Sequence, residues 1–367
     1  MTALPPASRA PEPGRHLALV GPTASAKSAV AIALATARNA AGLPTEIVSC
    51  DSMQVYRGMD IGTAKPTAAE QALVRHHLID LVEPTEEHNL GLFLKAAEPV
   101  LSGIEDRGAQ ALLVGGTGLY VRGIVDGFLP PPRYPELSRR LDELTTEELT
   151  ERLAELDPVA LGRIPGNRRR ILRALTVTVG SGRPFSEFGA ALEDYVDTPF
   201  VMCGLLPPRE ELAGRIASRY DEQLERGFLD EVGDLHSLGD RLSRTAAQAL
   251  GYREFLSHLR GELSLEQALA EAKVRTRRFA VRQIRWFRRD PRIRWYAAPE
   301  DEAQVAATAE AIDSLWRKSA TASVGSVVTV DQNHAVAGYP DPVVDSGHPD
   351  EPGAPREADA EQHEEVP

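Results

Sequence analysis

The sequence predicts an α/β protein whose doubly wound, mostly parallel sheet is interrupted by a helical insertion domain. Short apolar runs alternate with helical patterns along most of the chain, as expected for parallel strands joined by helices. A loop containing glycine, serine and lysine lies directly between the first apolar run and the first helical pattern. The alternation stops between the fourth and fifth runs, where leucines recur at helical spacing instead.

Six apolar runs are the expected strands of the sheet. In chain order they are residues 17–20, 46–49, 78–82, 111–114, 200–206 and 293–296. The expected helices of the core are an alanine-rich helix over 29–37, an amphipathic pair over 209–238 that Gly227 divides, and a long helix over 264–289.

The insertion is expected to begin at the proline run 130–132, which breaks the preceding pattern. Its leucines at helical spacing include Leu141, Leu144, Leu149, Leu153 and Leu156. We therefore expect a disordered N-terminus over 1–15, a core formed by 16–131 and 196–316, a helical insertion over 132–195, and a disordered acidic tail over 317–367.

The net charge of −13 is unevenly distributed, which bears on the partners that the chain can bind. From Ala320 onward there are ten acidic residues and one arginine. One basic cluster consists of Arg163, Arg168, Arg169, Arg170 and Arg173. A second runs from Lys273 to Arg294, and there we favour a phosphate backbone as partner over a merely solvated face. Clusters of this kind allow an acidic protein to bind a polyanion.

No apolar segment is long enough for a membrane span or a signal peptide, so we expect a soluble, cytoplasmic protein. Cys50 and Cys203 lie apart in apolar segments, which favours buried thiols in a reducing compartment over a disulfide or a metal site. His76 and His77 are adjacent in a strand candidate, where neighbouring side chains point to opposite faces. We expect one buried and one exposed histidine rather than a metal pair.

The loop after the first strand is the most specific motif. Residues 21–28 read Gly-Pro-Thr-Ala-Ser-Ala-Lys-Ser and fit the phosphate-loop pattern G-x-x-x-x-G-K-[ST] except at Ala26. In such loops, backbone N–H groups surround phosphate oxygens, the lysine adds charge and the final hydroxyl reaches Mg²⁺. The expected diphosphate-binding residues are Gly21, Thr23, Ala24, Ser25, Ala26, Lys27 and Ser28. Alanine fits most simply at a negative φ, the geometry that we favour for Ala26.

Asp51 follows the second expected strand, at the carboxyl edge of the sheet where the phosphate loop also lies. Its carboxylate can serve as a general base, or as a Mg²⁺ ligand together with Ser28. The phosphate loop alone is equally compatible with a nucleotide kinase, an ATPase or a GTPase, because one fold hosts many activities.

Several segments together resemble the tRNA dimethylallyltransferase family, also called tRNA isopentenyltransferase. Besides the phosphate loop they are residues 49–65, 76–80, 115–120, 250–253 and 282–287, in order within about residues 15 to 300. The resemblance implies a P-loop fold and a prenyl transfer. Dimethylallyl diphosphate gives its five-carbon group to N6 of the adenosine immediately 3′ of the tRNA anticodon, and diphosphate is released.

The resemblance also implies roles for individual residues. Asp51 matches the general base, Thr117 a threonine near the reacting centre, and Arg215 an arginine that stabilises the leaving diphosphate together with Mg²⁺. The positions expected to contact the tRNA anticodon stem-loop are Asp51, Ser52, Met53, Gln54, Thr117, Arg169, Arg170, Arg173, Gln248, Gly251, Tyr252 and Arg253. We expect a monomer.

Other interpretations stay open at this stage. A kinase or isopentenyltransferase acting on free nucleotides would not need the arginine-rich insertion, and a non-catalytic RNA-binding relative with a degenerate phosphate loop would not need Asp51. Arg215 and Arg219 share one helical face, and pairing with nearby glutamates is the plain alternative to a functional role. In the long helix we expect Phe279 and Trp286 to pack in the core.

Overall fold

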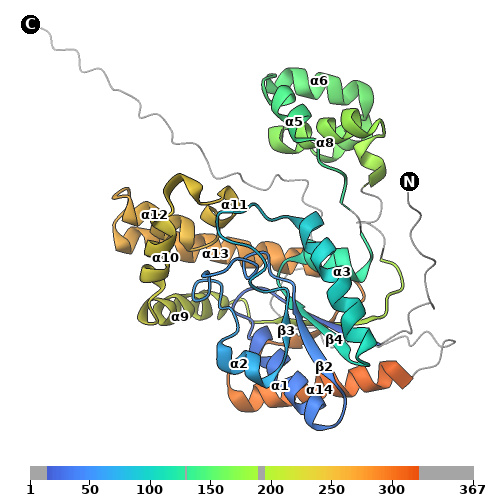
Figure 1. Ribbon diagram of the computed structural model, residues 1–367, viewed down its shortest axis with the longest axis vertical. Coiled ribbons are helices and arrows are strands. Elements are labelled where there is room, and N and C mark those ends of the chain that lie inside the picture. Colours follow the sequence, from blue (N-terminus) through green and yellow to red (C-terminus); the bar gives the residue numbers. More distant parts are fainter. Residues whose placement is uncertain (1–14, 129, 189–194, 322–367) are drawn as a thin grey trace, which may run out of the picture.

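The computed structural model describes residues 15–128, 130–188 and 195–321. Its centre is a six-stranded parallel sheet with the order β3-β2-β4-β1-β5-β6, flanked by helices (Figure 1). The strands are β1 (His16–Val20), β2 (Thr45–Ser49), β3 (His76–His77), β4 (Gln110–Gly115), β5 (Phe200–Leu206) and β6 (Arg294–Ala297). The predicted doubly wound parallel sheet is confirmed.

Helices cover the sheet and its carboxyl edge. Those of the core are α1 (Lys27–Ala40), α2 (Ala68–Leu73), α3 (Leu90–Asp106), α4 (Gly118–Val125), α9 (Leu212–Glu225), α10 (Phe228–His236), α11 (Arg244–Ala247), α12 (Tyr252–Leu259), α13 (Leu265–Phe287) and α14 (Glu302–Thr321), with a 3-10 turn at Gly239–Arg241. Those of the insertion are α5 (Pro135–Asp142), α6 (Thr146–Leu156), α7 (Pro158–Arg163) and α8 (Arg168–Ser181), followed by a 3-10 turn at Phe185–Phe188.

The alternation of side chains along β1 divides the core into two layers. Leu17 and Leu19 pack with α1 and α14 on one face of the sheet, whereas Ala18 and Val20 pack with α3 and α4 on the other. Both faces are covered, so β1 is buried throughout and reads as an uninterrupted apolar run. The carboxyl ends of the strands remain available for a site.

The expected strand over 78–82 is wrong. The chain pairs with β2 only at His76–His77, and Leu78 and Asp80 then adopt positive φ angles of 60° and 53°, which a pleated strand does not allow. The segment instead bonds to the loop after β2, where the Leu81 N–H donates to the Val55 carbonyl at 2.7 Å. Lys65 fixes this turn, because its Nζ donates to Asp80 Oδ1 at 2.6 Å.

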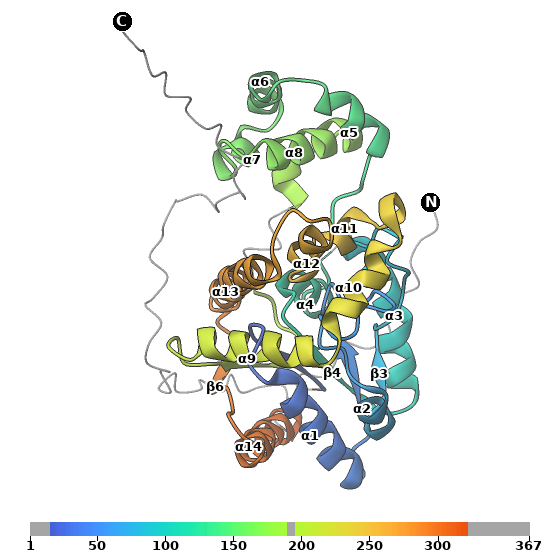
Figure 2. The same ribbon diagram turned by 90° about the vertical axis from the view of Figure 1, so that its left-hand side faces the viewer.

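Helices α10 to α13 lie between the sheet and the insertion, whereas α9 runs across at the level of the sheet (Figure 2). The predicted amphipathic pair is present as α9 and α10, divided at Gly227, whose φ is 93°. The long helix α13 begins after Ser264, whose side chain caps the helix together with Gln267. These helices share a core with the loop after β2 and therefore close the site from above.

The insertion has a small apolar core of its own and lies at one end of the molecule (Figure 1). Leu149 and Leu153 are fully buried in it, whereas Leu156 is half exposed. A capping box between Thr145 and Glu148 starts α6. The insertion is thus a helical unit whose interior does not depend on the sheet.

The expected boundary between core and tail at residue 317 is wrong, because α14 continues to Thr321. Trp316 is fully buried against the sheet and anchors this last helix. The rest of the expected acidic tail, and the expected N-terminal disorder up to residue 14, lie outside the described residues. Within the described ranges, no helix is both long and apolar enough to cross a membrane.

The cysteines agree with the prediction and the histidines do not. Cys50 and Cys203 are free and buried, and burial raises the pKa of both thiols. His76 and His77 are both half-buried, because the two-residue strand β3 lies at the edge of the sheet. His77 Nε2 bonds to Glu46 Oε2 at 2.6 Å, and His76 Nδ1 bonds to the Val74 carbonyl at 2.7 Å.

Candidate active site

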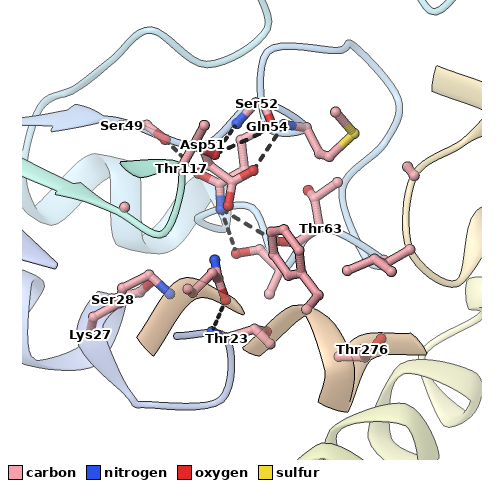
Figure 3. A pocket seen from close by; sticks show the side chains of 18 of the residues that line it. Thr23, Lys27, Ser28, Ser49, Asp51, Ser52, Gln54, Thr63, Thr117 and Thr276 are labelled. Atoms are coloured by element: carbon pink, nitrogen blue, oxygen red, sulfur yellow. Dashed lines mark hydrogen bonds between the residues drawn. The ribbon is translucent and has the colours of Figure 1, made fainter. Parts of the chain in front are cut away.

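One cavity of about 320 Å³ lies at the carboxyl edge of the sheet, beneath helices α9 and α13. It brings together Thr23, Lys27 and Ser28 of the phosphate loop and helix α1, Asp51 after β2, and Thr117 after β4. Figure 3 shows Lys27, Ser28 and Thr23 on one side, with Asp51, Ser52 and Thr117 on the other. Residues far apart in the chain thus meet where open α/β sheets bind ligands.

The phosphate loop departs from the expected backbone geometry at Ala26. Its φ is 58° and its ψ is 18°, so the expectation of a negative φ is wrong. Ala24 is also left-handed, with a φ of 61°. The loop must reverse direction between β1 and α1, and the residue directly before the helix takes the left-handed conformation, which costs an L-residue roughly 1–2 kcal/mol.

Lys27 is held inside the cavity by its hydrogen bond to the Pro22 carbonyl at 3.2 Å. Desolvation lowers the pKa of Lys27 to about 8, while nearby Asp51 acts in the opposite direction and Arg219 in the same direction. A desolvated ammonium group gains more from an anion than an exposed one does, because charges interact more strongly at low dielectric. The loop is therefore suited to a phosphate or diphosphate ligand.

Hydrogen bonds within the loop after β2, and from that loop to the turn after β4, fix Asp51 and Thr117. The Met53 N–H donates to Asp51 Oδ1 at 2.9 Å, and the Ser52 N–H donates to Thr117 Oγ1 at 3.1 Å. Gly115 allows this approach, because a Cβ there would lie 2.2 Å from the Cys50 carbonyl oxygen. Asp51 and Thr117 thus face one cavity on a rigid support.

Of the three residues expected beside the target base, Gln54 is largely committed to the fold. It accepts from Ser49 Oγ at 2.8 Å and donates to the Ala64 carbonyl at 3.1 Å, and only 8% of it is exposed. Ser52 and Met53 also line the cavity and are partly exposed. They are better placed than Gln54 to contact a ligand.

Of the two arginines on one face of α9, Arg219 lines the cavity and the expected Arg215 does not. Arg215 points away from the lining residues, where it donates to Glu211 Oε2 at 2.9 Å and to the Pro299 carbonyl at 2.9 Å. Arg219 lies one turn further along α9, lines the cavity and donates to Thr23 Oγ1 at 2.9 Å. The rotation of α9 about its axis decides between them, and the sequence does not define that rotation.

Gln283 of α13 is a site residue that the sequence reasoning missed. Its Oε1 accepts from the Thr23 N–H at 2.9 Å, and its Nε2 donates to the Gly116 carbonyl at 2.8 Å. The side chain is 7% exposed and lines the cavity. Gln283 lies within residues 282–287, one of the segments that resemble the family, and this was the only sign in the sequence of a role in the site. The sequence does not show which face of the arginine-rich helix Gln283 occupies.

The two aromatic residues expected in the core lie elsewhere. Phe279 is half-buried and lines the main cavity. Trp286 is 36% exposed, and it packs so closely on Gly118 that a Cβ there would lie 2.1 Å from the indole ring. Among the aromatic residues of α13, Phe287 is the one buried in the core.

The expected tRNA contacts in segment 248–253 are only partly accessible. Gln248 lines the cavity, and Arg253 donates to Gln248 Oε1 at 3.4 Å. Tyr252 has no exposed surface and its hydroxyl donates to Glu231 at 2.6 Å, while Gly251 is buried beside it. Tyr252 lines the cavity from the inside, whereas Gly251 is packed inward at the start of α12.

The arginines of the two basic clusters also fall into two groups, those bonded within the protein and those exposed to solvent. Arg173 donates to the carbonyls of Pro131 and Pro132 at 2.8 and 3.1 Å, so its guanidinium is engaged with the linker that leads into the insertion. Arg169 and Arg170 are exposed at the start of α8 and free to meet a partner. In the second cluster, Arg275 pairs with Glu254, whereas Arg277, Arg278, Arg282, Arg285 and Arg289 are exposed.

The donor set at the cavity fits Mg²⁺ held jointly with a substrate. Among the described residues, no group of three or more His, Cys, Asp or Glu side chains could hold a metal by itself. Ser28 and Asp51 both line the cavity. Mg²⁺ commonly takes one or two carboxylates plus substrate phosphates, so these two residues could complete its coordination together with a diphosphate.

Fold and site together define a class: a P-loop-type enzyme with a carboxylate facing the phosphate loop across one cavity, suited to transferring a group from a phosphorylated substrate. The family model for IPP transferases matches residues 54–290. The chain is 44% identical over 299 residues to a protein of Syntrophobacter fumaroxidans and 46% identical over 292 residues to one of Thermobifida fusca, both named tRNA dimethylallyltransferase. These alignments cover 78% and 77% of this chain and 85% and 91% of the relatives. The chain belongs to the IPP transferase family.

Solved structures agree with this assignment. The full-length tRNA isopentenylpyrophosphate transferase of Bacillus halodurans aligns with a TM-score of 0.60 and 34% identity, over 83% of this chain and 98% of that one. A eukaryotic dimethylallyltransferase acting on tRNA aligns with a TM-score of 0.68 and 26% identity, over 81% of this chain and 77% of that one.

Proposed function

We propose that this enzyme transfers the dimethylallyl group of dimethylallyl diphosphate to N6 of the adenosine immediately 3′ of the anticodon in tRNA, releasing diphosphate. The observation that carries the proposal is that Asp51 and the phosphate loop line the same cavity. The names of the relatives and of the aligned structures support the same activity.

In this reaction N6 forms a bond to C1 of the prenyl group as the bond from C1 to the diphosphate oxygen breaks. The exocyclic amine is a weak nucleophile, because its lone pair is delocalised into the adenine ring. Asp51 accepts the N6 proton, which lets the amine attack without accumulating positive charge. Thr117 orients this part of the site through its hydrogen bond with Ser52.

The leaving diphosphate keeps the electron pair of the broken bond and needs positive charge around it. Backbone N–H groups of the phosphate loop, Lys27 and Arg219 supply it within one desolvated region. Mg²⁺ held by Ser28 would neutralise further charge on the diphosphate, which leaves Asp51 to act as the base. Arg219 takes the role that the sequence assigned to Arg215.

The RNA partner is supported by exposed arginines on two elements. Arg169 and Arg170 start α8 of the insertion, and the exposed arginines of α13 flank the cavity that holds Phe279 and Arg282. A loop nucleotide whose base leaves the stack could enter this cavity while backbone phosphates lie along the arginines. The proposed partner is the tRNA anticodon stem-loop, the protein acting as a cytoplasmic monomer.

The test is incubation of purified protein with labelled dimethylallyl diphosphate, Mg²⁺ and unmodified tRNA, with AMP and adenosine in parallel. We expect label in tRNA adenosine and none in the free nucleotides. Asp51→Asn keeps the size of the side chain and should lower single-turnover rates by about 10²–10⁴ while tRNA binding persists. Labelling of AMP alone would establish the free-nucleotide alternative, and tRNA binding without transfer would establish the non-catalytic one.

A further inference from the structure

A single carboxylate holds one wall of the cavity in place without lining it. Glu231 of α10 accepts the N–H groups of three consecutive residues: Asp60 at 2.8 Å and Ile61 at 2.7 Å on Oε2, and Gly62 at 3.1 Å on Oε1. Tyr252 donates its hydroxyl to the same Oε1 at 2.6 Å. Four donors therefore converge on one carboxylate, and hydrogen bonds to an ionised acceptor are stronger than neutral ones.

The carbonyl side of the same loop is held by α9. Gln223 Nε2 donates to the carbonyls of Ile61 and Gly62 at 2.7 and 3.0 Å. Arg219 Nη2 donates to the Gly62 carbonyl at 3.2 Å, and its Nη1 donates to Thr23 Oγ1 at 2.9 Å. The Gly62 residue thus gives its N–H to Glu231 and its carbonyl to the arginine that spans to the phosphate loop.

Glycine is the only residue type that fits at position 62, between the loop and the rings of α10 and α12. A Cβ built there would lie 2.3 Å from the Phe228 ring and 2.6 Å from the Tyr252 ring. Backbone and rings are already in contact, so the loop has little freedom to find another position while α10 and α12 stay in place. Gly62 also lines the cavity, whereas Glu231 does not.

We propose that Glu231 is a positioning residue of the diphosphate site, acting through the Gly62 carbonyl on Arg219. Glu231 fixes residues 60–62, the Gly62 carbonyl holds one end of the guanidinium, and the other end is thereby directed to Thr23. Glu231 itself makes no contact with substrate. The proposal rests on the proposed function only in taking a diphosphate as the ligand.

The test compares Glu231→Gln with Asp234→Asn. The glutamine has the same size but turns an amide N–H₂ toward backbone donors, and Asp234 is an exposed acid three residues along the same helix. Binding of inorganic diphosphate with Mg²⁺ is measured by calorimetry, and the KM for dimethylallyl diphosphate and the melting temperature are measured alongside. We expect Glu231→Gln to weaken diphosphate binding about tenfold and raise KM similarly, while tRNA affinity and all Asp234→Asn values stay at wild type.

A double-mutant cycle separates positioning from simple support of the fold. If Glu231 acts through Arg219, Glu231→Gln should add less than twofold to the loss already caused by Arg219→Gln. Fully additive losses, or a lowered melting temperature with unchanged diphosphate affinity, would overturn the proposal. If Glu231→Gln does not fold, Tyr252→Phe replaces it in the test, because this variant keeps the Glu231 carboxylate and removes only the hydroxyl that donates to it. It should weaken diphosphate binding two- to threefold, and wild-type affinity in it would count against the proposal.

Inorganic diphosphate needs neither tRNA nor turnover, so these results stand apart from the proposed function. Suppose that the wild-type protein binds diphosphate, that Glu231→Gln weakens this binding, and that the wild-type protein does not label tRNA. This combination would refute the proposed function alone. Transfer to tRNA that is unaffected by Glu231→Gln would refute the positioning role alone.

Discussion

Gln283 of helix α13 accepts a hydrogen bond from the backbone N–H of Thr23 at 2.9 Å, linking residues 260 positions apart in the sequence. The same side chain donates to the Gly116 carbonyl, so the phosphate loop, the turn after β4 and α13 are fixed to one another. The geometry of the loop therefore depends on a helix that contributes none of the residues of its motif.

Gln283→Leu tests this link, because leucine is similar in size but leaves the Thr23 N–H and the Gly116 carbonyl without their partner. We expect the free energy of unfolding to fall by about 1–3 kcal/mol, the usual cost of unsatisfied buried groups. Dimethylallyl diphosphate affinity should fall as well, because the phosphate loop loses its brace. Urea denaturation and calorimetry measure the two effects, and wild-type values in both would mean that water replaces the side chain.

Arg219→Gln and Arg215→Gln form a matched pair on one helix. Arg219 lines the cavity and touches Thr23, so its loss should weaken dimethylallyl diphosphate binding at least tenfold. Arg215 is engaged with Glu211 and the Pro299 carbonyl, so its loss should change stability slightly and affinity by less than twofold. Equal losses of affinity in both variants would contradict the assignment of Arg219.

Ala26→Gly should stabilise the free protein rather than tighten substrate binding. Glycine adopts the left-handed backbone of residue 26 without a Cβ clash, so it removes a strain of roughly 1–2 kcal/mol, offset by about 0.4–1 kcal/mol of added entropy in the unfolded chain. We expect a net gain of about 0.5–1 kcal/mol in unfolding free energy. Ala29→Gly, inside α1, is the control and should lose about 0.5–1 kcal/mol. A destabilised Ala26→Gly protein would contradict this account.

The pH dependence of diphosphate binding should follow Lys27, whose pKa is lowered to about 8 by desolvation. The protonated lysine binds the anion, so affinity is full below pH 7 and falls as pH rises through 8 and deprotonates the free protein. Binding between pH 8 and 9.5 should therefore take up a proton, which calorimetry in buffers of different ionisation enthalpy detects. Lys27→Met should abolish the proton uptake, and uptake that persists in this variant would assign it to another group.

Charge reversal of Arg169 and Arg170 should weaken tRNA binding and reduce its salt dependence. Removing one arginine–phosphate interaction lowers the slope of log affinity against log salt by about 0.7–0.9. The control is the reversal of Arg317 and Lys318 on α14, at the opposite end of the molecule from the insertion (Figure 1). Filter binding from low to high salt measures both, and identical slopes would move the RNA interface away from α8.

The sequence alone determined the parallel α/β fold and the meeting of Asp51, Thr117 and the phosphate loop at one sheet edge. These follow from local signals, because apolar periodicity defines strands, and residues directly after parallel strands share an edge whatever the remaining packing is. The assignment of the long helix α13 is of the same kind, since Ser264 and Gln267 cap it locally.

Only the tertiary structure decided which helical side chains face the cavity and which support the fold. Arg215 and Arg219 lie four residues apart on α9, and the packing of Ile216 and Tyr220 in the core sets the rotation that turns Arg219 inward. Tyr252 and Arg173 are likewise committed to Glu231 and the proline linker by partners distant in the chain. Ala26 adopts its positive φ because the loop has to connect the end of β1 to the start of α1. This constraint depends on the relative positions of the strand and the helix, which the sequence of the loop does not specify.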